Sequence, residues 1–204
     1  MPQGAVITTP TVTFSTLAKL MGPSTPVGQA SLLRGHKYPT DGPRRSYQNA
    51  QQQLVDHLTL QQPFNPHAGL RPHEREVVLA LSQLGVPVPN GAACTKPSKR
   101  IPHWGFAGVD ISAFPDVDLT SPSGLGAMKV HFGKDALPRG VGPAMAALLH
   151  HYKSHVLQQA NVLPRHCLIY EARTGALHTC GSPTRLLINV QAACQLIVAL
   201  WPIL

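Results

Sequence analysis

The stretch from Gly108 to Lys134, GVDISAFPDVDLTSPSGLGAMKVHFGK, constrains the fold more than any other part of the chain. Two segments with alternating apolar and polar residues are joined by a turn rich in Ser, Pro and Gly. Such alternation indicates strands, and the turn between them predicts a β-hairpin. Met128 and Val130 are expected on one face of the hairpin, with Lys129 and His131 on the other, solvated face.

The first arm of this hairpin is interrupted by a proline. Val109–Ser112 alternates, and Val117 and Leu119 resume the pattern after Pro115. Because proline donates no backbone hydrogen bond, Pro115 predicts a bulge or an edge position in this arm.

Helical periodicity and turn residues predict the other elements. Apolar residues at steps of three and four predict a helix capped by Ser46, with Tyr47, Ala50, Leu54 and Leu58 on one face and the glutamines 51–53 facing outward. Further helices are expected at 72–84, at 143–156 and from Ser182-Pro183 onward, with a second hairpin formed by Cys167–Ala172 and Ala176–Cys180. The residues from Pro87 to Pro102 are expected to form a basic loop without regular structure.

The order of these elements predicts an α+β fold class, an α/β core in which helices flank a small mixed sheet built from two hairpins. A length of 204 residues suits one core domain. Residues 1–44 are rich in Thr, Ser, Pro and Gly and are predicted to be a flexible arm, which leaves residues 45–204 as the core domain.

Charge points to an anionic partner. The formal net charge is +8, and residues 1–100 hold 10 basic and 4 acidic side chains. Nucleic acid, DNA or RNA, is the expected partner, and acidic proteins or plain solubility are the alternatives. The predicted nucleic-acid-binding residues are Arg44, Arg45, Lys96, Lys99 and Arg100.

Cysteines and apolar runs bear on localisation. The four cysteines contain no CxxC pair, and no signal-peptide pattern precedes Lys19, so the sequence predicts a cytoplasmic protein. The apolar run from Leu186 to Leu204 is interrupted by Asn189, Gln191 and Gln195. We expect a buried helix there and no membrane partner, with a single tail anchor as the alternative.

The order of an acid-bearing strand, a turn, a lysine-bearing strand, a helix and a second hairpin resembles the core of the PD-(D/E)xK superfamily, the restriction-endonuclease-like nucleases. The resemblance covers about residues 70–180, with Pro115-Asp116 as the PD element and Lys129 as the lysine. The family keeps an acid two positions before that lysine, where this chain has Ala127. The runs GAMKVHFGK, AALLHHY and CLIYEARTG are also similar to uncharacterised bacterial proteins of about this length, a resemblance that implies a shared fold only.

What the resemblance implies is metal-dependent phosphodiester chemistry. Clustered carboxylates would hold Mg²⁺ or Mn²⁺, the metal would activate water, and a lysine would stabilise charge. The implied catalytic residues are Asp116, Asp118, Lys129 and Glu74, with Asp116 and Asp118 as metal ligands; without catalysis, no cofactor is expected. In the exonuclease branch of this superfamily, the helix that follows carries a Gln four residues before a Tyr; this chain has Tyr152, but the earlier position is Leu148.

Each of these residues has a structural alternative. Lys129 and Asp118 would form a cross-strand ion pair if they lie opposite each other. Asp116 would shape a turn, and Glu74 would be a charge at a helix start. Zinc binding is a further alternative, by the helical pair His151 and His155 or by a cluster in the second hairpin, His166, Cys167, His178 and Cys180.

Together these observations predict a nucleic-acid-binding accessory protein with a degenerate nuclease-like core, or a weak metal-dependent nuclease. The resemblance alone places such a protein in mobile-element or defence systems. The alternatives are a non-enzymatic subunit that binds other proteins in a larger complex, and a zinc-binding regulator. The sequence leaves open whether the protein is an enzyme, and leans against it.

Overall fold

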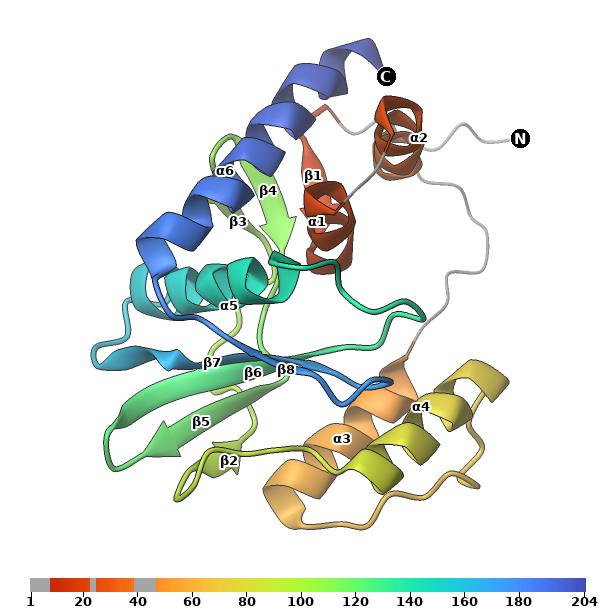
Figure 1. Ribbon diagram of the computed structural model, residues 1–204, viewed down its shortest axis with the longest axis vertical. Coiled ribbons are helices and arrows are strands. Elements are labelled where there is room, and N and C mark those ends of the chain that lie inside the picture. Colours follow the sequence, from red (N-terminus) through yellow and green to blue (C-terminus); the bar gives the residue numbers. More distant parts are fainter. Residues whose placement is uncertain (1–7, 23–24, 39–46) are drawn as a thin grey trace.

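The computed structural model describes residues 8–22, 25–38 and 47–204. These residues form a five-stranded sheet, a smaller three-stranded sheet, and helices on both faces of the larger sheet (Figure 1). The predicted α+β fold class is confirmed. The α-helices are α1 (Phe14–Met21), α2 (Pro26–Lys37), α3 (Gln48–Leu60), α4 (Pro72–Leu84), α5 (Val141–His151) and α6 (Pro183–Leu200); a π-turn η1 (Tyr152–Val156) follows α5, and a short 3₁₀ turn η2 (Trp201–Ile203) follows α6.

The larger sheet joins two hairpins, as the sequence predicts. Its strand order is β2 (Ala93–Thr95), β5 (Val117–Ser121), β6 (Gly124–His131), β7 (Val162–Glu171) and β8 (Leu177–Thr179). Strands β5 and β6 pair antiparallel, and so do β7 and β8. Strands β6 and β7 pair parallel, which requires the crossover that α5 and η1 provide. Strand β2 lies within the segment predicted to be irregular, and it pairs with β5.

A glycine permits the parallel join between the hairpins. The register of β6 and β7 shifts between Leu125 and Ala127, so the backbones approach closely at Gly126. A Cβ atom at Gly126 would overlap the carbonyl oxygen of His166. Only glycine fits this position, because every other residue carries that atom.

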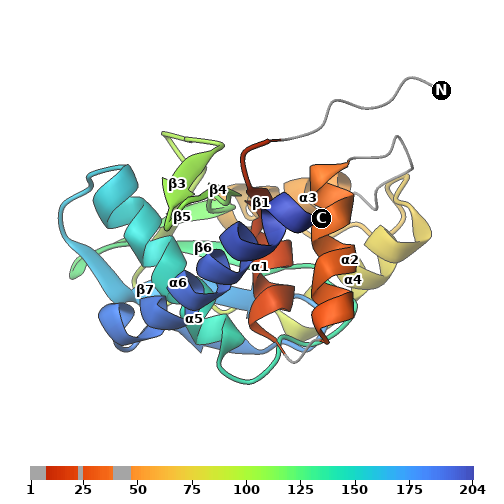
Figure 2. The same ribbon diagram turned by 90° about the horizontal axis from the view of Figure 1, so that it is seen from above.

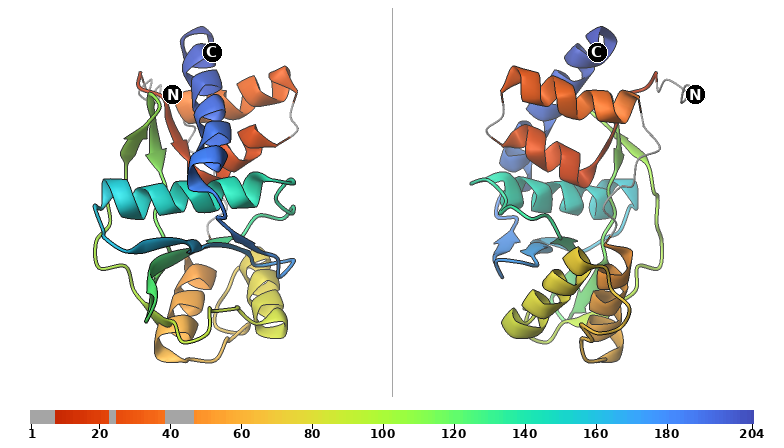
Figure 3. Two further views of the ribbon diagram at one scale, coloured as in Figure 1. Left: turned by 60° about the vertical axis from the view of Figure 1, so that its left-hand side comes forward. Right: turned by 90° about the vertical axis from the view of Figure 1, so that its right-hand side faces the viewer.

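Helices cover both faces of the larger sheet. Helices α3 and α4 pack on the face that holds Val117, Met128 and Val130. Helix α5 packs on the opposite face, which is the face of Ala127 and Cys167. The prediction of a solvated face was wrong because α5 is apolar on nearly all sides, and such a helix needs cover both below and above. Figure 3 shows α5 lying between the sheet and α6.

The prediction of a flexible arm at residues 1–44 was wrong for its described parts. Residues 8–22 and 25–38 contain β1 (Thr11–Thr13), α1 and α2, and the side chains of Phe14, Leu17 and Leu33 are buried in the main core. Thr13 caps α1 by accepting a hydrogen bond from the backbone N–H of Thr16 at 3.3 Å. The arm was mispredicted because α1 is only 8 residues long and the sequence on either side of it is rich in Thr, Ser and Pro.

The first arm of the predicted hairpin divides between two sheets. Strand β4 (Val109–Ser112) pairs parallel with β1 and antiparallel with β3 (Trp104–Phe106) in the smaller sheet. The chain then crosses to the larger sheet through residues 113–116. The Trp104 indole donates to the Ala113 carbonyl at 2.8 Å and fixes the start of this crossing. Pro115 therefore separates two strands and does not interrupt one.

Helix α6 crosses the outside of α5 and α1 (Figure 2). Within the described part of the chain, the segment Pro183–Ile203 is the one helix long and apolar enough to cross a membrane. Its inner residues Val190, Cys194 and Ile197 are buried in the main core. Only 28% of this segment is buried, so the expectation of a buried helix holds for its inner side alone, and Ile188 and Val198 on its outer side are exposed.

Candidate functional site

Asp116 lies immediately before β5 and is fully buried. Its carboxylate accepts hydrogen bonds from the Val130 backbone N–H at 2.7 Å, from Lys129 Nζ at 3.1 Å and from the Gln51 side-chain amide. The backbone N–H of Asp116 donates to the Met128 carbonyl at 2.9 Å, which fixes the carboxylate against β6. All three of these partners are hydrogen-bond donors, so they hold both oxygens of the carboxylate in place.

Gln51 was predicted to face outward, and this was wrong. It lies in the first turn of α3 and binds Asp116, so it joins the helix to the acid-bearing strand. No sequence signal distinguishes it from Gln52 and Gln53, because the three glutamines are consecutive.

Lys129 lies between Asp116 and two aromatic rings. Its ammonium group is 5.4 Å from the ring centre of Phe114 and 6.0 Å from that of Phe14. The guanidinium of Arg100 lies 5.1 Å from the same Phe114 ring. The structure therefore brings together one residue predicted to be catalytic and one predicted to bind nucleic acid.

Asp118 pairs with a lysine that the sequence did not point to. Its cross-strand neighbour on β6 is Ala127, and its carboxylate accepts a hydrogen bond from Lys153 Nζ at 2.6 Å. The side chain of Lys153 is 2% exposed and that of Asp118 is 14% exposed. The cross-strand pair between Asp118 and Lys129, weighed as an alternative, was wrong, since Lys129 binds Asp116 instead.

The π-turn η1 carries Lys153 into the site. The Leu157 N–H donates to the Tyr152 carbonyl at 2.9 Å, five residues back, so the turn holds one more residue than an α-helical turn. Tyr152 and Lys153 are consequently both buried. The Ile101 N–H donates to the Tyr152 hydroxyl at 2.9 Å, which fastens the basic loop to this helix end. Burial raises the pKa of Tyr152, and nearby Asp118 adds to the rise.

Glu74 connects the first turns of two helices. Its carboxylate accepts hydrogen bonds from the backbone N–H groups of Arg71 at 3.3 Å and Asn49 at 3.0 Å. Burial opposes its ionisation, but these donors outweigh burial and hold the pKa of Glu74 below its usual value. Asn49 and the Gln51 that binds Asp116 share the first turn of α3, so both acids lie at its positive end.

Three of the predicted nucleic-acid-binding residues lie in the segment between β2 and β3. Lys96 pairs with Asp56 of α3 at 3.1 Å, and Lys99 and Arg100 are exposed in the loop that leads to β3. Arg44 and Arg45 lie outside the described residues.

The histidine and cysteine alternatives do not form a ligand cluster. In the ranges that the structure describes, no group of three or more His, Cys, Asp or Glu side chains is placed to hold a metal ion. The rings of His151 and His155 stack at 4.6 Å. Cys167 and Cys180 are free thiols, and burial raises their pKa values to about 12 and about 11.

The carboxylates do not offer a divalent cation the donor set that the family resemblance implies. Mg²⁺ and Mn²⁺ bind carboxylate oxygens that face no competing cation. One oxygen of Asp116 and one of Asp118 already contact lysine ammonium groups, and Ala127 supplies no ligand. With these side chains as they lie, the residues do not fit the ion.

The chain matches no family model, no curated protein and no solved structure.

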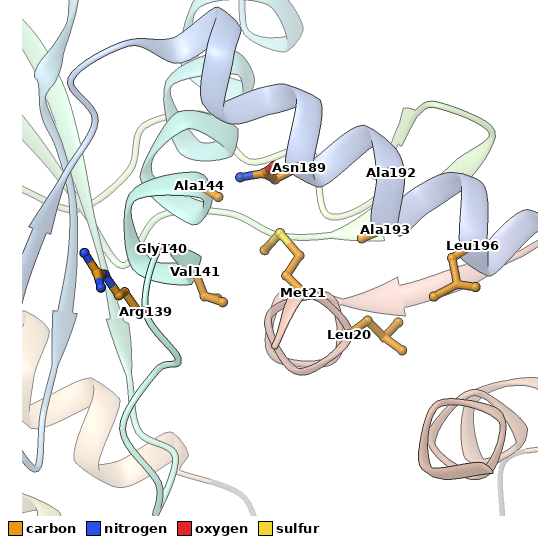
Figure 4. Close-up of a pocket in the computed structure, with 10 residues that line it drawn as sticks. All are labelled: Leu20, Met21, Arg139, Gly140, Val141, Ala144, Asn189, Ala192, Ala193 and Leu196. Carbon is orange, nitrogen blue, oxygen red and sulfur yellow. The ribbon is translucent and has the colours of Figure 1, made fainter. Parts of the chain in front are cut away.

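A groove of about 420 Å³ lies at the other end of α5 from Lys153 (Figure 4). It runs between α1, α5 and α6, and polar and apolar atoms share its surface about equally, with Leu20 and Leu196 among the apolar residues and Arg139 and Asn189 among the polar ones. None of the predicted site residues lines it.

Proposed function

We propose that this protein is a nucleic-acid-binding accessory protein, built on a degenerate nuclease-like core and acting in the cytoplasm. The order of the larger sheet supports the proposal. The PD-(D/E)xK resemblance implies an acid-bearing strand, a turn, a lysine-bearing strand, a helix and a second hairpin, in that order. Strands β5, β6 and β7 with α5 follow that order.

The observation that carries the proposal is the cluster of Arg100, Phe114 and Lys129. The guanidinium of Arg100 and the ammonium of Lys129 lie 5.1 Å and 5.4 Å from the centre of the Phe114 ring. Cations attract phosphate groups, and arginine on an aromatic ring offers a planar surface for stacking on a base. The exposed Lys99 extends the positive charge along the same loop.

Lys129 adds little net positive charge to this cluster, because Asp116 neutralises its ammonium group. Arg100 and Lys99 therefore carry the attraction to phosphate, and Lys129 holds the acid-bearing strand in place. A cluster of this kind binds nucleic acid without needing a metal ion at the carboxylates.

The first test measures binding of labelled single- and double-stranded DNA and RNA by fluorescence anisotropy, with Mg²⁺, with Mn²⁺ and with chelator. We expect binding that weakens with salt and that persists with chelator, because it requires neither Mg²⁺ nor Mn²⁺. Cleavage that requires metal would instead support the weak nuclease. Absence of binding at low salt would overturn the proposal.

The second test places the contact on the surface. Arg100→Ala should weaken binding and flatten the slope of log affinity against log salt, by roughly 0.9 for each contact to duplex phosphate that is lost. Arg75→Ala is the matched control, since Arg75 is exposed on α4, over the other face of the sheet. Equal effects of the two substitutions would mean that the attraction is only general.

One observation favours a second function, binding of another protein. The outer side of α6 exposes Ile188 and Val198, with Ile203 just beyond the helix. If the nucleic-acid tests fail, the proposed function passes to this non-enzymatic subunit role.

A further inference from the structure

Three residues form a row across the larger sheet below the end of α5. Asp118 on β5 lies opposite Ala127 on β6, and Ala127 lies opposite Cys167 on β7. Neighbours in such a row have Cβ atoms about 5 Å apart on the same face. Because Ala127 and Cys167 are small and buried, the centre of the row leaves space above the strands.

Lys153 fills that space from the helix side. Its ammonium group reaches Asp118 at 2.6 Å, and its side chain is 2% exposed. It also lies near enough to Cys167 to oppose the rise in the thiol pKa that burial causes. A charge this deeply buried is costly unless it is paired, so the pair is a fixed part of the fold.

We propose that the ammonium group of Lys153 is a built-in cation, held over β5 and β6 in the place where a divalent metal ion would otherwise bind Asp118. The carboxylate is neutralised from the helix above it. The uncharged side chain of Ala127 fits this arrangement, because a second carboxylate in the row would leave one negative charge without a partner.

An ammonium group in place of a metal ion changes the chemistry of the site. An ammonium group neutralises a carboxylate and donates hydrogen bonds, but it offers no open coordination position at which water ionises near neutral pH. The acids of this core then stabilise the fold and do not bind a reactive ion. This inference rests on the nuclease-like core of the proposed function, but not on nucleic-acid binding.

The decisive experiment removes the ammonium group from the helix and adds a carboxylate to the strand. In Ala127→Glu with Lys153→Ala, a carboxylate replaces the ammonium group above Asp118 in a similar volume. We expect this double variant to gain saturable Mn²⁺ binding, measured by electron paramagnetic resonance of free Mn²⁺. It should also gain a rise in melting temperature with MnCl₂ that NaCl of equal ionic strength does not give.

The matched control is Ala127→Gln with Lys153→Ala, which has nearly the same shape without the added charge. It should gain much less Mn²⁺ binding than the glutamate variant. If the glutamate variant folds and binds no more Mn²⁺ than its glutamine control, the proposal is overturned.

A second arm decides the question if the glutamate variant does not fold. The wild-type protein is compared with Asp118→Asn combined with Lys153→Met, in which both charges are removed together. The proposal expects equal, negligible Mn²⁺ binding in the two proteins. Saturable binding in the wild type that the neutral double variant loses would show that metal displaces Lys153, and would overturn the proposal.

Discussion

Asp116 and Asp118 lie two positions apart in the chain, yet their surroundings differ. Asp116 is wholly enclosed and is bound by a backbone N–H, an amide and an ammonium group. Asp118 is slightly exposed and has one ammonium partner, Lys153. The first carboxylate therefore fixes backbone and side chains together, whereas the second holds one helix end to one strand.

Removal of the Asp116 carboxylate should destabilise the fold severely. Asp116→Ala leaves Lys129, which is 18% exposed, without its partner and the Val130 N–H without an acceptor. We expect a loss of about 3–5 kcal/mol in the free energy of unfolding, measured by urea denaturation. Asp56→Ala, which breaks the exposed pair with Lys96, should change that free energy little. Similar losses in the two variants would contradict this account of Asp116.

The pair of Asp118 and Lys153 should show strong coupling. Lys153→Met alone leaves a largely buried carboxylate unpaired, so we expect a loss of about 3–5 kcal/mol in the free energy of unfolding. Adding Asp118→Asn should restore much of that loss, because both charges are then gone. A double-mutant cycle in urea checks the coupling. Simple additivity of the two substitutions would mean that the contact contributes nothing.

At the scale of elements, α5 carries a pH dependence. Burial lowers the pKa values of His150 and His151, and the neighbouring histidines add to the effect. In the unfolded chain these imidazoles have pKa values of about 6.5, so as the pH falls the unfolded chain binds protons before the folded protein does. The contribution of the neutral rings to stability is complete above about pH 6.5 and is lost below it. Glu74, whose pKa is lowered, loses its own contribution only at more acidic pH.

Melting temperatures between about pH 5 and pH 8 measure this effect, and they should fall toward acid. His151→Phe preserves the ring that contacts Trp104 and Phe106 but removes one titrating group. Its melting temperature should fall less steeply toward acid. An unchanged slope would show that His151 does not carry the effect.

Elements with local signals were predictable from the sequence, and those that depend on distant partners were not. The bounds of α4 follow from Pro72 and Gly85, and the register of β7 with β8 follows from the turn at 173–175. The π-turn that buries Lys153 has no such signal, because a lysine after Tyr152 reads as a side chain on the polar side of a regular helix. The contact of Gln51 with Asp116 depends on the placement of α3, and the contact of Lys153 with Asp118 depends on the π-turn, so neither could be predicted from the sequence.

At the scale of the molecule, the N-terminal helices belong to the core. Leu17 is fully buried in the cluster that also contains residues of α5 and α6. Helix α1 is only 8 residues long, which is too short to show a helical period in the sequence. Leu17→Ala should lower the free energy of unfolding by about 2–5 kcal/mol, through lost burial and the cavity left behind. Val27→Ala on α2 is the control, because Val27 is exposed. A loss no larger than that of the control would restore the interpretation of a flexible arm.

Early and late segments of the chain meet in this core. Helix α1 packs on α6, and Lys37 Nζ donates to the Trp201 carbonyl at 2.6 Å. On the ribosome, residues 14–37 are therefore made long before the helix that covers them. We expect nascent chains that lack residues 183–204 to remain sensitive to protease around Phe14–Met21, and protection to appear only when the last helix has emerged. Folding of this half of the molecule is then a late, single event of synthesis.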